Sequence, residues 1–256
     1  MDFEAFSAAL RAACEATGQV DGLVLLGSTS TAGAARRDAW SDHDVYVVLA
    51  DGAADELRSS LAFLPYPERV VARARESQLG FAVLYDDGHL LEFAAGTRAE
   101  LAVVRSGTYE LAIGRPDVEA LVRESALPRP DDDLVSAADH VTLALIKLMV
   151  GVGRVRRGEA VNGGQFVHGY AISHLCRAAR ARLAPDATSV DTDLDPVRRI
   201  ERDLPGFGTR LAAALDLPTE PAAQAVFDLT RQTLEPGWPA FPSATADAIA
   251  RRLGWT

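Results

Sequence analysis

The chain of 256 residues is 48% hydrophobic and 24% charged, and no apolar stretch approaches the length needed to cross a membrane. Its formal charge of −10 comes without a basic cluster larger than pairs such as Arg36-Arg37 and Arg156-Arg157, which argues against binding to long nucleic acid. An acidic surface favours a small cationic substrate through electrostatic steering, although it also serves solubility.

The cysteine content and the N-terminal residues of the chain predict the cellular compartment in which the protein acts. Cys14 and Cys176 form no CxxC pair, so we expect neither a disulfide framework nor a zinc site. Asp2 and Glu4 stand where a signal peptide would carry basic residues. We therefore expect a cytoplasmic protein without membrane association, acting as a monomer or homodimer.

The first helix is predicted to begin after Asp2 and to end near Gly18, because apolar residues recur between them at helical spacing. Its apolar positions are Phe3, Phe6, Leu10 and Cys14. Cys14 is thus expected to be a core residue and not a nucleophile.

Two buried strands are predicted on either side of a polar segment. The apolar runs at 23–26 and 45–49 are short, contain valine and are bounded by glycine or aspartate. Gly27-Ser28 ends the first run, and Asp42-His43-Asp44 opens the second. The segment between them can form about two helical turns, so the predicted order is strand, turn, short helix, strand.

Two carboxylates and a glycine-serine pair give this stretch its chemistry. Because side chains alternate across a strand, Asp42 and Asp44 point to the same side of the sheet. Like charges this close repel unless a cation lies between them, and oxygen-only ligands suit Mg²⁺. Gly27 lets backbone N–H groups approach a phosphate, and Ser28 adds a hydroxyl at a helix N-terminus. The stretch predicts a site for a metal-bound triphosphate; the alternative is a helix cap followed by two turn aspartates.

This arrangement resembles the signature of the DNA polymerase β-like nucleotidyltransferase superfamily, in which Gly-Ser, a spacer and Asp-x-Asp lie between two apolar strands. The wording WSDHD at 40–44 and the chain length look most like the aminoglycoside and lincosamide nucleotidyltransferases of that superfamily. The resemblance implies ATP or another NTP as co-substrate, Mg²⁺ as cofactor and a small-molecule acceptor. His43 stands where an apolar residue is commoner in the superfamily, which leaves its packing open.

A helix at 53–64 and a part-exposed strand at 69–75 precede the clearest hairpin, with strands at 79–85 and 89–95. Glu92 on its second strand is a charge between small apolar neighbours, and such a carboxylate is costly to bury without a partner. The superfamily resemblance implies a third carboxylate on a neighbouring strand, and Glu92 matches that position as metal ligand or general base. An exposed glutamate on an edge strand is the alternative.

Strand-like pieces at 101–104 and 109–113 and a helix after Pro116 complete the predicted first half. The stretch at 126–134 contains Pro128, Pro130 and three consecutive aspartates, and marks a change to helical composition. We therefore predict an α/β (α+β) domain of nucleotidyltransferase type with a mixed sheet over 1–127. An all-α helical bundle domain is predicted over 128–256.

The second half is predicted to be helical from Leu134 onwards, with an apolar stripe to residue 155 and a break at Gly163-Gly164. Further helix starts are predicted at Asp195-Pro196, Thr219 and Ser243. Several helices with short links favour a bundle.

Lys147 is the only lysine in the sequence and lies in the most apolar predicted helix. The resemblance implies that it reaches the nucleotide phosphates; a snorkelling lysine is the alternative. Asp139 is placed on the same helix face as Lys147, while Tyr170 and His174 lie one turn apart on the next helix. These three are candidates for acceptor contacts, or they satisfy local hydrogen bonds only.

The predicted reaction is in-line attack of a substrate hydroxyl on the α-phosphorus, with loss of pyrophosphate, in a cleft between the two domains. Asp42 and Asp44 hold one or two Mg²⁺ ions. Gly27 and Ser28 seat the triphosphate, and Glu92 accepts the proton. A protein-modifying adenylyltransferase of a toxin–antitoxin pair stays open, as does a catalytically silent nucleotide-binding module, against which both aspartates argue. The acceptor and the preferred base also stay open.

Overall fold

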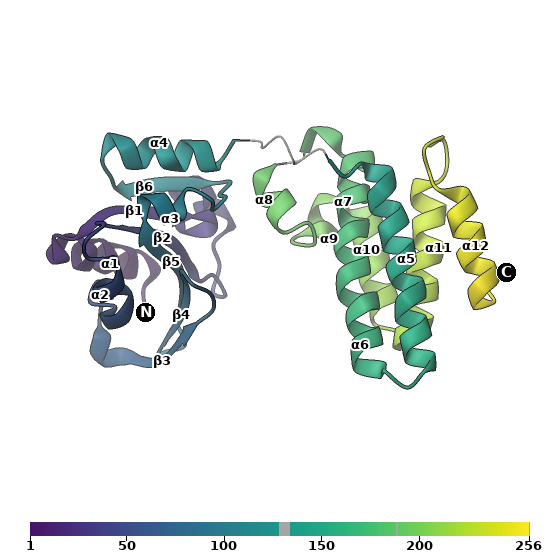
Figure 1. The fold of residues 1–256 in the computed structure, drawn as a ribbon, viewed down its shortest axis with the longest axis horizontal. Helices are drawn as coiled ribbons and strands as arrows, with labels where there is room; N and C mark the ends of the chain where they lie inside the picture. The colour runs from purple at the N-terminus through teal and green to yellow at the C-terminus, as the bar shows by residue number, and fades with distance from the viewer. Residues whose placement is uncertain (128–133, 188, 256) are drawn as a thin grey trace. The chain divides into compact units, whose positions relative to one another are not determined.

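The computed structural model describes residues 1–127, 134–187 and 189–255 (Figure 1). The chain divides into two compact units, Met1–Leu127 and Pro128–Thr256. The proline and aspartate stretch predicted as the domain boundary falls on 128–133, outside the described residues. Within the described ranges, no helix combines the length and the apolar character needed to cross a bilayer.

The first unit is built on a six-stranded sheet. Its strands are β1 (Val20–Leu26), β2 (His43–Leu49), β3 (Val70–Arg75), β4 (Gly80–Tyr85), β5 (Leu90–Thr97) and β6 (Tyr109–Ile113), with a 3₁₀ turn, η3 (Pro67–Arg69), before β3. The strand order is β3-β4-β5-β2-β1-β6; β2 and β5 run parallel, and the other neighbours pair antiparallel. The predicted mixed sheet is confirmed, and the parallel pair joins the Asp-x-Asp strand to the second strand of the hairpin.

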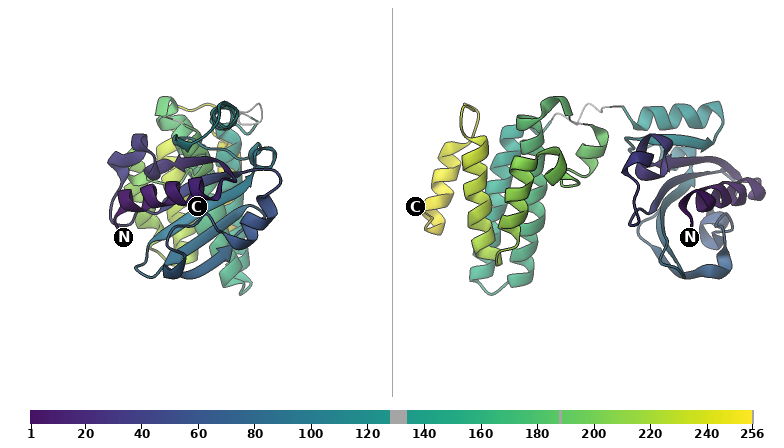
Figure 2. Two further views of the ribbon diagram at one scale, coloured as in Figure 1. Left: turned by 90° about the vertical axis from the view of Figure 1, so that its left-hand side faces the viewer. Right: turned by 180° about the vertical axis from the view of Figure 1, so that it is seen from behind.

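Helices cover both faces of this sheet (Figure 2). They are α1 (Phe3–Thr17), α2 (Ala54–Ser60), α3 (Arg98–Leu101) and α4 (Pro116–Ser125). Because side chains alternate along a strand, Val45 and Val47 pack with α1 and α2, whereas Val48 packs with α3 and α4 on the opposite face. The strand β2 is therefore buried on both sides, and polar chemistry is confined to its N-terminal end.

The segment between β1 and β2 forms two short 3₁₀ turns, η1 (Gly27–Thr29) and η2 (Thr31–Arg36). Ser30 starts the second turn, because its hydroxyl accepts a hydrogen bond from the Gly33 N–H at 3.1 Å. The predicted order of strand, turn, short helical segment and strand is present. However, the helix N-terminus expected at Ser28 is a 3₁₀ turn of 3 residues and not the start of an α-helix.

One local prediction in this unit is wrong, and one predicted helix is present but shorter. The strand predicted at 101–104 is α3 and the turn that follows it. A capping box explains the helix: the Glu100 N–H donates to the Thr97 hydroxyl at 3.3 Å, and the Thr97 N–H donates to the Glu100 carboxylate at 2.8 Å. The helix predicted at 53–64 ends at Ser60, because Leu61 adopts a left-handed φ of 54°.

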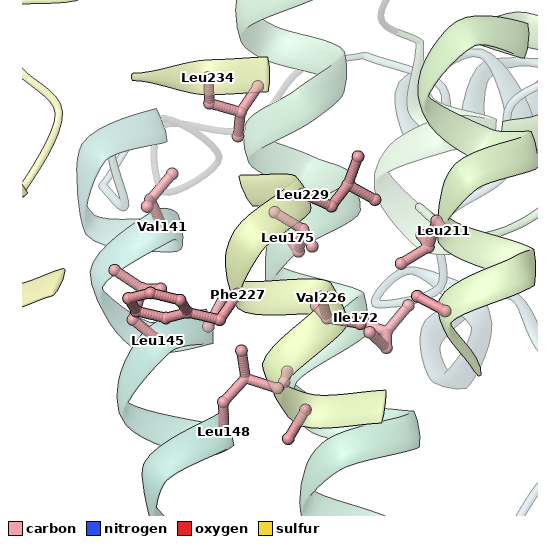
Figure 3. Packing of buried hydrophobic residues seen from close by; sticks show 14 of the residues in the cluster. Val141, Leu145, Leu148, Ile172, Leu175, Leu211, Val226, Phe227, Leu229 and Leu234 are labelled. Carbon is pink, nitrogen blue, oxygen red and sulfur yellow. The ribbon is translucent and has the colours of Figure 1, made fainter. Parts of the chain in front are cut away.

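The second unit is helical, as predicted. Its α-helices are α5 (Ala137–Arg156), α6 (Ala160–Gln165), α7 (Ala171–Leu183), α8 (Val190–Leu194), α9 (Ile200–Asp203), α10 (Pro205–Leu215), α11 (Thr219–Leu234) and α12 (Ser243–Leu253). A π-helical turn, η4 (Phe166–Tyr170), joins α6 to α7, and a 3₁₀ turn, η5 (Pro185–Ala187), follows α7. Figure 3 shows apolar side chains of α5, α7, α10 and α11 meeting in one core.

Two helix boundaries in this unit differ from prediction. Gly163-Gly164 is not a break but lies within α6, and the chain turns instead at Gly158, with φ 84°. Gly163 allows close helix packing, since a Cβ there would lie 2.8 Å from the Gly151 carbonyl oxygen. The helix start predicted at Asp195-Pro196 is also wrong, because α8 ends just before it and the next helix begins at Ile200.

Candidate active site

Three carboxylates gather at the N-terminal end of β2. Asp42 directly precedes the strand, and Asp44 lies opposite Glu92 in the parallel register of β2 and β5. Because both strands alternate in step, Asp44 and Glu92 point to the same face of the sheet. One carboxylate oxygen from each of Asp42, Asp44 and Glu92 lies within 4.8 Å of the other two. All three side chains are half-buried, so they are accessible from solvent.

The electrostatics of this carboxylate group favour a bound cation. Burial raises the pKa of Glu92, and the nearby Asp42 and Glu76 carboxylates raise it further. The repulsion is relieved if a cation shares the three carboxylates. A set of ligands made only of carboxylate oxygens suits a hard ion such as Mg²⁺, which completes its shell with water and phosphate oxygens. The residues present therefore fit the metal that the sequence motif predicts.

The loop that follows β1 is attached to the same strand end. The Asp44 N–H donates to the Thr29 hydroxyl at 3.0 Å, so η1 is fixed beside the first residues of β2. Gly27 adopts φ 50°, and its N–H donates to the Thr108 carbonyl at 2.9 Å. The Gly27 N–H is therefore engaged within the protein. Ser28 is 5% exposed at the centre of the loop.

A close contact between the two 3₁₀ turns shapes this loop. The Ser30 hydroxyl donates to the Gly27 carbonyl at 2.8 Å and accepts from the Gly33 N–H at 3.1 Å. A Cβ atom at Gly33 would lie 1.8 Å from the Gly27 carbonyl oxygen, which is far inside van der Waals contact. The loop therefore requires glycine at position 33.

Arg37 was not among the predicted site residues, yet its guanidinium donates hydrogen bonds to two carbonyls of this loop. Its Nε and Nη2 donate to the Ser28 carbonyl at 3.1 and 3.0 Å, and Nη2 also donates to the Thr29 carbonyl at 3.4 Å. The sequence shows Arg37 only as half of a basic pair. Thr29 is likewise a residue that the Gly-Ser pattern does not single out, because its contact is to a backbone amide distant in sequence.

His43 lies between the two aspartates in sequence but on the opposite face of the sheet. Its ring stacks on Phe3 of α1, with centroids 3.7 Å apart, and its Nε2 lies 2.8 Å from the Ser7 hydroxyl. Burial, followed by the nearby His89 and Arg37, lowers the pKa of His43 to about 3. His43 is therefore a neutral core residue that takes the place of an apolar one.

The remaining predicted site residues belong to the helical unit. Lys147, Tyr170 and His174 line one pocket of 250 Å³ together with Phe166 and Ser173. The Lys147 ammonium lies 5.5 Å from the centroid of the Phe166 ring, a cation–π contact. The structure thus brings three of these predicted residues together on α5, η4 and α7.

Asp139 differs from the other predicted residues of this unit. Its carboxylate accepts hydrogen bonds from the Ser136 N–H at 3.2 Å and the Ser136 hydroxyl at 2.6 Å, and so caps the start of α5. These hydrogen bonds lower the pKa of Asp139 and keep it charged. Asp139 does not line the pocket formed by Lys147, Tyr170 and His174.

The chain matches no family model and no curated protein. It is similar to the solved structure of a nucleotidyltransferase-like protein from Exiguobacterium sibiricum 255-15, at 12% sequence identity and a TM-score of 0.37, covering 90% of this chain and 75% of that chain. It is also similar to an aminoglycoside 6-adenyltransferase from Bacillus subtilis, at 9% identity and a TM-score of 0.35, covering 100% of this chain and 93% of that chain. Both likenesses are of low sequence identity and low TM-score.

Proposed function

We propose that the protein is a Mg²⁺-dependent nucleotidyltransferase that moves AMP from ATP to a hydroxyl of a small cationic acceptor of the amino-sugar or lincosamide kind. The observation that carries this proposal is the group of Asp42, Asp44 and Glu92, whose oxygens lie within 4.8 Å of one another. The loop beginning at Gly27 is hydrogen-bonded to the same strand end. The formal charge of −10 supports a cationic acceptor.

Each carboxylate has a role in this proposal. Asp42, Asp44 and Glu92 would hold the metal, which, when bound, supplies positive charge to the phosphate oxygens. Glu92 also accepts the proton of the acceptor hydroxyl, as a general base at the edge of the carboxylate group. The acceptor oxygen forms a bond to the α-phosphorus. The bond between the α-phosphorus and the oxygen that bridges it to the β-phosphorus breaks, and pyrophosphate leaves. Ser28 and its neighbours seat the triphosphate.

The helical unit is proposed to contribute binding groups. Lys147 offers an ammonium for the triphosphate, since it is the charged side chain among those lining its pocket. Tyr170 and His174 offer an aromatic ring and an imidazole for the acceptor. Asp139 stays charged and exposed at the start of α5, where it offers a carboxylate to a cationic acceptor.

A transfer assay tests the proposed function. The full chain is incubated with α-labelled ATP, Mg²⁺ and a panel of amino-sugar and lincosamide acceptors, with Asp44→Asn as the control. We expect labelled acceptor and free pyrophosphate only with wild type and Mg²⁺. Label that appears on polypeptides and not on any small acceptor would instead favour a protein-modifying adenylyltransferase.

A further inference from the structure

Arg37 connects the Gly27–Thr29 loop to β2 in two ways, the first of which is through backbone carbonyls of the loop. Its guanidinium donates to the carbonyls of Ser28 and Thr29, while the Thr29 hydroxyl accepts from the Asp44 N–H. In a trans peptide the C=O and the following N–H point in opposite directions. Holding these two carbonyls therefore fixes the orientation of both peptide planes, including the N–H groups of Thr29 and Ser30, and the Thr29 hydroxyl holds them next to Asp44.

The second route is a stack of three planar groups. The Arg37 guanidinium lies over the Phe3 ring, 4.0 Å from its centroid. The His43 ring also stacks on Phe3, with the ring centroids 3.7 Å apart and 23° between the planes. His43 is fully buried and separates Asp42 from Asp44 in the chain. Arg37 is thus connected through Phe3 to the start of β2, where His43 lies between the two aspartates.

The surroundings of Arg37 show why arginine is needed there. Its side chain is 16% exposed, whereas Glu4, its ion-pair partner, is 75% exposed. An exposed partner contributes little, so the loop carbonyls and the Phe3 ring are the main contacts. A guanidinium can stack on a ring and donate in its own plane at the same time, and an ammonium cannot.

We propose that Arg37 is a positioning residue for nucleotide binding: it sets the peptide planes of the Gly27–Thr29 loop and couples them to the end of β2. This inference rests on the proposed nucleotidyltransferase function. It assigns to Arg37 no contact with the substrate, because its donors are already engaged by protein carbonyls and Glu4.

The test compares Arg37→Met and Arg37→Lys with two control variants on α1. Arg11→Met removes an exposed cation that pairs with Glu15, and Leu10→Ala removes a fully buried side chain from the core. Binding of a non-hydrolysable ATP analogue with Mg²⁺ is measured by calorimetry, and the melting temperature of each variant is measured in parallel. Phe3→Leu is included because it breaks the stack but keeps an apolar side chain and all of the Arg37 hydrogen-bond acceptors.

We expect Arg37→Met to weaken binding of the analogue by about 10-fold or more, since small displacements of a positioned group have effects of this size. Arg37→Lys should not rescue binding, and Phe3→Leu should weaken it as well. Leu10→Ala should lower the melting temperature with unchanged affinity, and Arg11→Met should change neither. Unchanged affinity in Arg37→Met, while wild type binds the analogue, would overturn this inference alone. If wild type itself does not bind the analogue, the proposed function fails and this inference fails with it.

Discussion

Glu92 has two tasks in the proposed site, because it completes the carboxylate group and accepts the proton of the acceptor. In the metal-free protein, burial and the Asp42 carboxylate raise the pKa of Glu92, and a carboxylate at this position can act as a general base. Its position opposite Asp44 follows from the parallel pairing of β2 and β5. A neutral replacement of the same shape separates the chemical role of Glu92 from its packing.

Glu92→Gln is expected to lower kcat by about 100-fold or more, the usual scale for loss of a general base, with little change in nucleotide affinity. The reason is that proton transfer occurs in the transition state, whereas the nucleotide is also held by other groups. Steady-state kinetics and ATP titration measure the two effects. Glu76→Gln is the matched control, because it removes an exposed carboxylate near Glu92 and leaves Glu92 itself in place. Equal kcat in wild type and Glu92→Gln would leave Glu92 without a catalytic role.

Lys147→Met is expected to weaken Mg-ATP binding by about 1–3 kcal/mol, the scale of a hydrogen bond to a charged group, without changing thermal stability. Methionine keeps most of the apolar stem that packs near Phe166, and only the ammonium is lost. Lys147→Arg should restore binding in part. The control is Arg154→Met, which removes another cation from the same Phe166 ring. Nucleotide titration with unchanged affinity in Lys147→Met would exclude the phosphate contact.

The loop between β1 and β2 depends on the close approach of its two 3₁₀ turns. Gly33→Ala places a methyl group against the Gly27 carbonyl, which the loop can accommodate only by moving. We expect the variant to lose Mg-ATP affinity and to be destabilised by about 1–3 kcal/mol, as overpacked sites commonly are. Calorimetric titration and chemical denaturation measure both effects.

Gly164→Ala provides the control for Gly33→Ala. Gly164 lies within α6, and an added Cβ there would meet no atom within 4 Å. Alanine should therefore stabilise the helix by up to about 1 kcal/mol. If Gly33→Ala behaves like Gly164→Ala, the contact between the two turns does not shape the nucleotide loop.

The helices α5 and α7 are joined by a histidine pair that makes stability depend on pH. The Nδ1 atoms of His140 and His174 lie 3.0 Å apart, so only one of them carries the proton between the rings. Burial, followed by His174 and Arg177, lowers the pKa of His140 to about 4, against the opposing effect of Asp139. Between pH 6.5 and about 4 the unfolded chain therefore binds more protons than the folded chain at this position.

The free energy of unfolding should consequently decrease as the pH falls from 6.5 towards about 4, with the loss complete below that value. His140→Gln removes this contribution, so its unfolding free energy should depend less on pH over the same range. Urea denaturation of both proteins at several pH values measures the difference. Parallel pH profiles would show that the pair does not affect stability.

Elements with strong local patterns were predictable from the sequence. Periodic apolar residues identified α1 and α5, and the apolar runs identified β1 and β2. The errors arose where a single contact overrides the local pattern. At Gly163 a close helix neighbour takes the space that a side chain would fill, and at Thr97 a capping box starts a helix in an apolar segment. The contact at Gly163 joins residues on different helices and leaves no local pattern, whereas Thr97-x-x-Glu100 is a helix-start pattern that the sequence does show.

The candidate site was predictable to a similar extent. Asp42 and Asp44 are two residues apart at the start of one strand, so their proximity follows from the alternation of side chains in extended chain. Glu92 required the superfamily resemblance, since the parallel pairing of β2 with β5 joins residues far apart in sequence. Arg37 escaped prediction because it contacts main-chain carbonyls, which leave no pattern of residue types.

Across the whole protein, the proposed function depends on whether the three carboxylates bind a metal together with a nucleotide. Binding of Mn²⁺ to the full chain can be titrated with and without a non-hydrolysable ATP analogue, with electron paramagnetic resonance as the readout. This experiment needs no knowledge of the acceptor. Wild type should bind Mn²⁺ more tightly when the analogue is present. Asp42→Asn and Asp44→Asn should each weaken this binding by about 100-fold or more, since even groups that only support metal ligands have effects approaching that size. Their melting temperatures should equal or exceed that of wild type, because each change removes one of three repelling charges. Equal Mn²⁺ binding by wild type and both variants, or none by wild type, would contradict a metal-dependent nucleotidyltransferase.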